Sequence, residues 1–267
     1  MTTPTHIFLT PNDIGDYVAD RILREIDAAR AAGRSYLLGS PTGRTPRPIY
    51  AAMAQRLAAQ PRDLSHVTLV MMDEYLVPGA NGLEYAPPNA SWASHHFVGV
   101  EILAPLNATL PPAHQLRADK VWFPMPNDPA EYDARIAGAG GIDLFLLASG
   151  ASDGHVAFNP PGSPRDSLTR VIPLSDETRR DNLQTFPAFG TLDAVPRFGV
   201  SVGVATIVSS RAALMVVWGA GKRLTMSRIA AATRYDPEWP ATMIHECANG
   251  EIVADEAAAG DPSAGTY

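Results

Sequence analysis

Four short apolar segments, each ending in a polar loop, constrain the fold of this chain more than any other feature. They cover residues 36–38, 67–72, 142–148 and 214–218, and most of them lead into a helical pattern. Strands that are apolar throughout and alternate with helices are typical of a parallel sheet that is covered by helices on both faces. We therefore expect an α/β fold in which the polar loops meet beyond the carboxyl ends of the strands.

The remaining segments extend this α/β pattern along the chain. We expect a further strand at residues 6–9, a helix with its N-cap at Asn12 or Asp13, and helices at residues 49–57 and 224–232. Residues 77–88 are rich in Pro, Gly and Asn and are expected to form an irregular loop over the site.

The chain shows no linker long enough to separate two domains. We expect one domain over residues 1–255 and a flexible tail over residues 256–267, where small and polar residues predominate.

Composition narrows the choice of partners and location. The 28 acidic residues outnumber the 21 basic residues, which argues against nucleic-acid or membrane-surface binding. Cys247 is the only cysteine, and no apolar run is long enough to span a membrane. The first residues also lack the features of a signal peptide. We therefore expect a cytoplasmic protein, and a homo-oligomer is compatible with these observations.

Residues 40–45 join a predicted strand to a predicted helix and have the composition of an anion-binding turn. Gly43 permits close approach of the backbone, the start of a helix presents free N–H groups, and Thr42 and Thr45 add hydroxyls. The alternative is an ordinary capped turn. Lys222 lies at another predicted helix start, where a lysine is easier to explain if an anion binds there.

Two carboxylates, those of Asp73 and Glu74, follow the strand at residues 67–72. A carboxylate at the end of an apolar strand can be partly desolvated, which raises its pKa and makes it a usable base. The alternative is a pair of solvated loop residues.

The segment from Asp153 to His155 is the sharper signal. An acid two residues before a histidine can orient the imidazole and stabilise its charged form. The alternative is a capping aspartate and a histidine satisfied by packing. His95 and His96 lie in a predicted helix beside aromatic residues and are interpreted as packing or surface residues. No set of histidines and acids has the spacing of metal ligands, so no metal is expected.

Together these motifs resemble the glucosamine-6-phosphate deaminase (isomerase) and 6-phosphogluconolactonase family, from about residue 5 to residue 255. The resemblance is carried by residues 38–46, 72–75, 153–159, 202–206 and 219–222, in that order. The Met-Asp-Glu-Tyr and Ala-Phe-Asn spellings are closer to the deaminase branch than to the lactonase branch.

The resemblance implies a three-layer α/β/α fold with a mainly parallel, Rossmann-like sheet and a cofactor-free reaction on a phosphorylated sugar. In the deaminases, the residue matched by Asp73 moves a proton at C2 of the open-chain amino sugar. The residue matched by His155 opens the pyranose ring, and the one matched by Asp153 orients it. The loop at Thr42, Gly43 and Thr45 would hold the phosphate together with Lys222.

The expected binding residues form one set around the substrate and its phosphate. They are Ser40, Thr42, Gly43, Arg44, Thr45, Glu74 and Lys222.

The chain departs from the family pattern at several positions near the expected site, among them Ala151 and Ser152, which stand where a glycine and an asparagine are usual. Pro160 stands where the deaminases have a glutamate that assists the histidine, and Gln184 stands where a phosphate-binding arginine is expected. Arg44 replaces a loop glycine, and its guanidinium can bind phosphate through two hydrogen bonds. We therefore expect Arg44 to compensate for the arginine that is missing at Gln184.

Three functions follow from this pattern. The first is a hydrolase-class aldose–ketose isomerase that deaminates a hexosamine 6-phosphate, such as glucosamine 6-phosphate or an epimer. The second is a lactonase in which His155 activates water against a sugar-phosphate lactone, so that Asp73 is dispensable. The third is an inactive sugar-phosphate sensor, which Pro160 and Gln184 favour and the retained Asp73 and His155 oppose.

Overall fold

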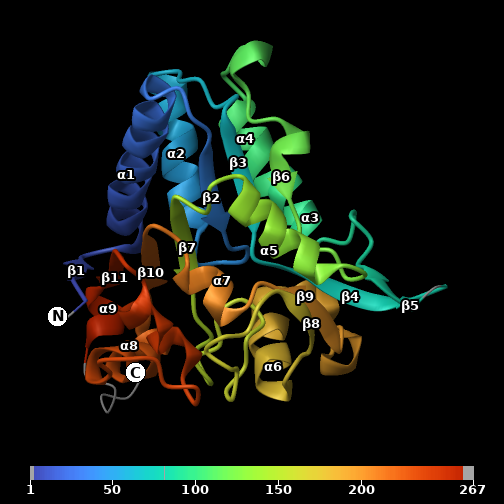
Figure 1. Cartoon of the computed structure of the whole chain (residues 1–267). Coiled ribbons are helices and arrows are strands. Elements are labelled where there is room, and N and C mark those ends of the chain that lie inside the picture. The colour runs from blue at the N-terminus through green and yellow to red at the C-terminus, as the bar shows by residue number, and fades with distance from the viewer. Residues whose placement is uncertain (1–2, 81, 261–267) are drawn as a thin grey trace.

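The computed structural model describes residues 3–80 and 82–260 and contains two β-sheets (Figure 1). The larger sheet has seven strands: β1 (Thr5–Phe8), β2 (Tyr36–Ser40), β3 (Val67–Met71), β6 (Val121–Trp122), β7 (Leu144–Ala148), β10 (Ala213–Val217) and β11 (Gly250–Asp255). Their order is β1-β11-β10-β7-β2-β3-β6, and every neighbouring pair is parallel. The predicted parallel sheet is confirmed, with strand ends within two residues of the expected positions.

Helices and short helical turns make up most of the remaining structure. The α-helices are α1 (Pro11–Ala31), α2 (Arg47–Ala59), α3 (Ser94–Phe97), α4 (Ala104–Asn107), α5 (Pro129–Gly138), α6 (Asp176–Thr185), α7 (Val204–Val208), α8 (Arg223–Ala231) and α9 (Glu256–Ala259). The π-helix η1 (Val98–Leu103) joins α3 to α4. The 3-10 turns are η2 (Pro112–His114), η3 (Ala118–Lys120), η4 (Pro187–Phe189), η5 (Leu192–Ala194), η6 (Ala220–Lys222) and η7 (Pro240–Glu246).

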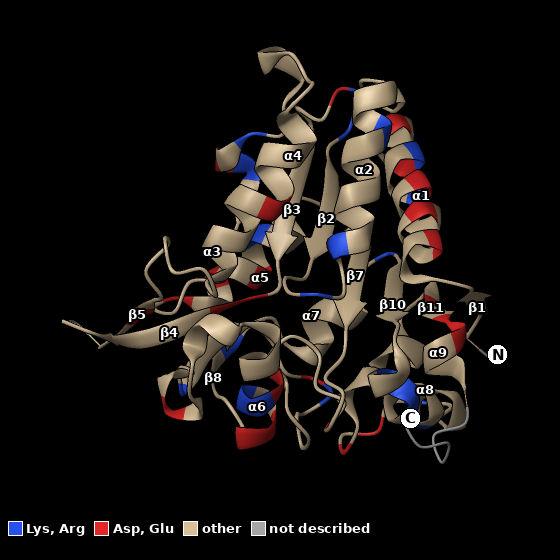
Figure 2. Cartoon of the chain, turned by 180° about the vertical axis from the view of Figure 1, so that it is seen from behind, with Lys and Arg blue, Asp and Glu red and all other residues tan. Residues whose placement is uncertain are grey.

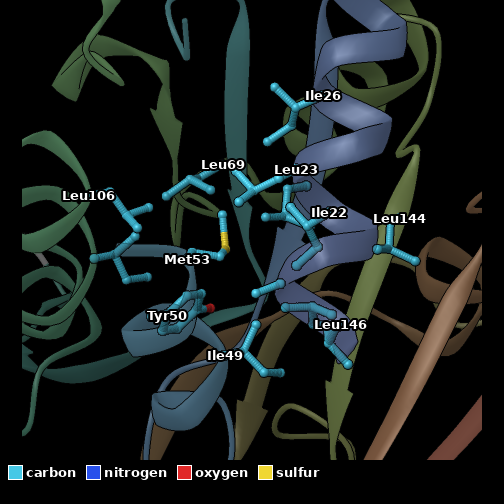
Figure 3. Close-up of a cluster of buried hydrophobic side chains, with 14 of the residues drawn as sticks. Ile22, Leu23, Ile26, Ile49, Tyr50, Met53, Leu69, Leu106, Leu144 and Leu146 are labelled. Carbon is cyan, nitrogen blue, oxygen red and sulfur yellow. The ribbon is translucent and has the colours of Figure 1, made fainter. Parts of the chain in front are cut away.

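Apolar side chains on both faces of the large sheet create two cores. Successive side chains of a strand point to opposite faces, so Leu38 packs against α1 and α2 whereas Leu37 packs on the side of α5 and α8. Figure 3 shows the first core, in which Ile22 of α1 and Met53 of α2 meet Leu69 of β3. The three-layer α/β/α class is therefore confirmed.

The smaller sheet is antiparallel and was not predicted. It contains β4 (Asp73–Gly79), β5 (Gly82–Tyr85), β8 (Arg170–Pro173) and β9 (Phe198–Ser201), in the order β5-β4-β9-β8. The predicted irregular loop at residues 77–88 is wrong. The strands β4 and β5 pair there as a hairpin that projects from the body of the molecule (Figure 1), and none of the described residues between 77 and 88 lines the cavity described below.

Two predicted boundaries differ from the structure. The N-cap of α1 is Thr10 rather than Asn12 or Asp13, because its hydroxyl accepts a hydrogen bond from the Asp13 backbone and the Asp13 carboxylate bonds back. The expected tail begins as helix α9, since the Asp255 side chain accepts a hydrogen bond from the Ala258 N–H and Ala258 is buried. The rest of that tail, residues 261–267, lies outside the described residues.

Charged residues of both signs are spread over the surface, and the outer face of α1 carries many of them (Figure 2). Arg56 of α2 pairs with Asp16 and Asp20 of α1, which ties the two helices together at their exposed sides. Within the described residues, no helix is long and apolar enough to cross a membrane.

Candidate active site

A cavity of about 580 Å³ opens where the carboxyl ends of β2, β3, β7 and β10 meet. Because these strands are parallel, the loops that follow them surround one volume. The predicted site residues that line it are Thr42, Gly43, Arg44, Thr45, Asp73, His155 and Lys222. The structure thus brings together residues from four separate polar loops.

Asp73 lies at the point where the chain leaves the large sheet and enters the small one. It is separated from β3 by Met72 and is the first residue of β4, with its side chain buried at the cavity wall. Burial and the negative charge of the adjacent Glu74 raise the pKa of Asp73 to about 7, against a weak opposing contact from Ser94 Oγ at 3.5 Å. A carboxylate with this pKa is a competent base near neutral pH.

Glu74 does not line the cavity, and its expected contact with the substrate stays a prediction. Neighbouring side chains of a strand point to opposite sides, and the fully buried Glu74 carboxylate therefore turns toward the start of α3. It accepts hydrogen bonds from the backbone N–H groups of Tyr75, Ser94 and His95, and it bonds to His95 Nδ1 at 2.6 Å. Glu74 instead acts on the site through its charge, beside Asp73.

His95 combines the packing role that the sequence predicted with a polar one that it did not. Its ring stacks on Phe123 with the centroids 3.6 Å apart, and its Nδ1 holds the Glu74 carboxylate. Because His95 bonds to the buried Glu74 carboxylate, less free energy is lost when this second acid is buried next to Asp73.

Asp153 and His155 form a close pair on the turn after β7. Asp153 Oδ1 lies 2.6 Å from His155 Nδ1 and also accepts the His155 backbone N–H. Burial opposes ionisation of Asp153, but the His155 hydrogen bonds and charge hold its pKa below the usual value. The pair needs the small Gly150, because a Cβ there would lie 2.2 Å from His155 Nδ1. With Nδ1 held by the carboxylate, Nε2 is the nitrogen left for a substrate.

The expected anion-binding turn follows β2. Gly43 has a φ of 86°, a backbone conformation that glycine adopts without strain, and Thr42 and Thr45 line the cavity beside it. Ser40 is fully buried within β2, its hydroxyl bonds to the Leu38 carbonyl, and it does not line the cavity. The strand encloses the Ser40 side chain, and its expected contact with the substrate stays a prediction.

Lys222 lies at the end of η6, before α8, and lines the cavity. Its Nζ donates a hydrogen bond to the Ser149 carbonyl, and burial lowers the pKa of Lys222 to about 8. A part-buried ammonium group that lines a polar cavity is a strong candidate for holding an anionic substrate group.

The two arginines of α6 do not replace the arginine that is missing at Gln184. Buried Arg179 donates to the Leu192 and Val195 carbonyls, whereas exposed Arg180 pairs with Glu177. Gln184 itself lines the cavity. That leaves Arg44 as the arginine on the cavity wall, and its guanidinium pairs with no carboxylate in the described part of the chain.

Replacing Arg44 by alanine should weaken phosphate binding about tenfold, the effect of losing one charge-assisted hydrogen bond to an anion. Calorimetric titration with inorganic phosphate measures the change. Arg47→Ala is the matched control, because Arg47 begins α2, pairs with Glu101 and does not line the cavity. Equal phosphate affinity in Arg44→Ala and the parent protein would assign Arg44 to the surface.

Asp181 and Thr178 of α6 are site residues that sequence reasoning missed. Thr178 Oγ1 lies 3.4 Å from Asp153 Oδ2 and 3.3 Å from His155 Nδ1. One ligand atom each of Asp153, His155 and Asp181 lie within 4.8 Å of one another, a set that the described residues offer to a metal ion. Asp153 and His155 are already hydrogen-bonded to each other, so this set fits an acid–base pair with a neighbouring acid. No local spacing links Asp181 to His155, since only the packing of α6 brings them together.

The family of glucosamine-6-phosphate isomerases/6-phosphogluconolactonase matches residues 10–254 of this chain. The chain belongs to this family. A glucosamine-6-phosphate isomerase of Candida albicans is 31% identical over 255 residues, covering 95% of this chain and 96% of the relative. A glucosamine-6-phosphate deaminase of Rhodococcus opacus is 33% identical, covering 94% and 89%. These relatives are named isomerases or deaminases, so they do not support the predicted hydrolase class.

Solved structures of both branches of this family share the fold. A monomeric glucosamine-6-phosphate deaminase superposes with a TM-score of 0.78 at 22% identity, covering 96% of this chain and 98% of its own. The 6-phosphogluconolactonase of Trypanosoma cruzi superposes with a TM-score of 0.70 at 15% identity, covering 98% of each chain. At these identities the superpositions establish the fold, and the choice between the branches depends on the site.

Proposed function

We propose that this family member is a glucosamine-6-phosphate deaminase, which converts a hexosamine 6-phosphate to a ketose 6-phosphate and ammonia without a cofactor. The observation that carries the proposal is that Asp73, a buried carboxylate with a pKa near 7, lines the same cavity as His155 and Lys222. Removing a proton from carbon requires such a base, whereas hydrolysis of a lactone does not. The sequence relatives named as deaminases support the same choice.

The cavity supplies a group for each proton transfer. His155 Nε2 takes the proton of the C1 hydroxyl and passes it to the ring oxygen, which opens the sugar to the aldehyde. Asp73 then removes the C2 proton to give an enolate and returns it to C1. A proton moves from the nitrogen to the C1 oxygen, so that C1 becomes a hydroxymethyl group and C2 an imine. Water adds to this carbon and ammonia leaves. Asp153 keeps the His155 imidazole in the productive orientation and stabilises its charged form.

The phosphate end of the substrate is assigned to Lys222, Arg44 and the turn around Gly43. Two cations and a helix start give the complementary charge, and binding at this end fixes C2 relative to Asp73. A phosphorylated sugar is a cytoplasmic metabolite, which supports a cytoplasmic location.

A panel of hexosamine 6-phosphates and sugar-phosphate lactones, assayed separately for ammonia release and for acid release, tests the proposal. We expect ammonia from at least one hexosamine 6-phosphate. Acid release from a lactone without any ammonia would support the lactonase alternative instead. Binding without turnover of any compound would support the sensor.

The pH dependence of kcat/KM should be bell-shaped, because it reports ionisations of the free enzyme. Asp73 must be deprotonated, so kcat/KM should fall about tenfold per unit below pH 7. Lys222 must be protonated, so kcat/KM should fall again above pH 8. The phosphate of the substrate titrates near pH 6 and cannot produce the acid limb at 7.

Lys222→Arg separates the two limbs of this profile, because an arginine stays charged throughout the range. The alkaline limb should move to higher pH while the acid limb stays in place. An unmoved alkaline limb would show that another group titrates there.

A further inference from the structure

Asp181 has one carboxylate oxygen engaged and one free. Its Oδ2 accepts hydrogen bonds from the Ala151 N–H at 3.0 Å and from Ser152 Oγ at 3.2 Å, which fixes the side chain against the turn after β7. Its Oδ1 accepts no hydrogen bond from the residues that the structure describes. Asp181 lines the cavity, so this oxygen is a spare acceptor that a ligand can reach.

Asp181 also lies between the two ends of the cavity. On one side its carboxylate is within 4.8 Å of the ligand atoms of Asp153 and His155. On the other side its negative charge is the largest influence that raises the pKa of Lys222 against burial, while Arg44 acts in the opposite direction. The carboxylate therefore neighbours both the group assigned to the ring oxygen and the group assigned to the phosphate.

The chemistry of a hexose 6-phosphate limits what such a carboxylate meets. The phosphate is carried by C6, and both C6 and the ring oxygen are bonded to C5. The remaining ring neighbour of C5 is C4. A residue that lies between the protein partners of the phosphate and of the ring oxygen can therefore reach the hydroxyl on C4.

We propose that Asp181 is a specificity-determining residue whose Oδ1 accepts a hydrogen bond from the C4 hydroxyl of the sugar phosphate. The charged acceptor makes the site sensitive to the presence and the configuration of that hydroxyl, since a site built to bond a hydroxyl discriminates strongly against an analogue that lacks it. This inference rests on the proposed function only in taking a hexose 6-phosphate as the ligand.

Calorimetric titration with glucose 6-phosphate, galactose 6-phosphate and 4-deoxyglucose 6-phosphate tests the assignment. These sugars carry no amine, so their binding is measured independently of deaminase activity, which the ammonia assay follows separately. The parent protein should bind one epimer roughly 10- to 100-fold more tightly than the 4-deoxy sugar, the range for a hydrogen bond to a charged group. Asp181→Asn should lose most of that preference and bind the 4-deoxy sugar as the parent does.

The asparagine variant keeps the bonds to Ala151 and Ser152 through its amide oxygen and presents an NH₂ group where Oδ1 stood. Glu177→Gln is the matched control, because Glu177 is an exposed acid of the same helix, does not line the cavity and should leave every affinity unchanged. The proposal is overturned if the parent binds the 4-deoxy sugar as tightly as both epimers. It is also overturned if Asp181→Asn weakens all three sugars equally, since Asp181 would then act through the turn.

Discussion

Asp73→Asn should abolish deamination while leaving the protein folded. The substitution keeps the size of the side chain and removes the basic carboxylate, so kcat/KM for ammonia release should fall at least 10²-fold, the usual contribution of a positioned base. A continuous ammonia assay on glucosamine 6-phosphate measures the loss. Full activity of the variant on the substrate that the panel identifies would refute the role of Asp73 and favour the lactonase.

Thermal unfolding of the same variant at pH 8 controls for misfolding. The pKa of Asp73 is raised in the folded protein, so the folded state binds a proton more tightly than the unfolded state does. Its contribution to stability therefore falls as the pH rises from about 4 to about 7, and at pH 8 the protein carries a buried charge. Asparagine removes that charge, so the Tm of Asp73→Asn at pH 8 should be no lower than that of the parent.

His155→Gln should slow the reaction of the ring-closed sugar about 10²-fold, because glutamine cannot exchange a proton with the ring oxygen. A 5-deoxy hexosamine 6-phosphate cannot form the pyranose ring, so its deamination should be far less affected. The ratio of kcat/KM for the two substrates, in the parent and in the variant, measures the effect.

His114→Gln provides the control for the histidine substitution. His114 lies in η2, does not line the cavity, and its replacement should leave both rates unchanged. Equal losses on the pyranose substrate and on the 5-deoxy analogue in His155→Gln would show that His155 acts after ring opening.

The convergence of the polar loops could be predicted from the sequence because it follows from strand direction alone. Thr42, Asp73, His155 and Lys222 each come after an apolar strand, and parallel strands deliver such residues to one edge. This prediction requires neither the pKa of Asp73 nor the packing of its neighbours.

The small sheet and the direction of Glu74 could not be predicted in the same way. The strand that begins at Asp73 pairs with β9, far along the chain, and local patterns do not encode such a partner. Two adjacent acids in a loop can both face a ligand, whereas in a strand they must diverge. The sequence analysis placed both acids after the strand at residues 67–72, and the alternation along β4 turns Glu74 away from the cavity.

The place of Asp181 in the site could not be predicted from the sequence either. It stands in a helix with a polar sequence, and nothing in its neighbourhood distinguishes it from Asp176 or Glu177. Its importance arises only when α6 packs over the turn after β7 and its Oδ2 bonds to Ala151 and Ser152. The role of Asp181 is therefore visible only in the folded structure, in contacts between segments that are distant in sequence.

The central claim is that the enzyme breaks a carbon–hydrogen bond at C2, and proton NMR in deuterium oxide tests it most directly. With glucosamine 6-phosphate, we predict that the parent enzyme removes the C2 proton signal and that ammonia appears, whereas Asp73→Asn leaves the signal intact. The opposite result would contradict this claim. The C2 proton signal would persist with the parent enzyme, although the same concentration of that enzyme hydrolyses a sugar-phosphate lactone.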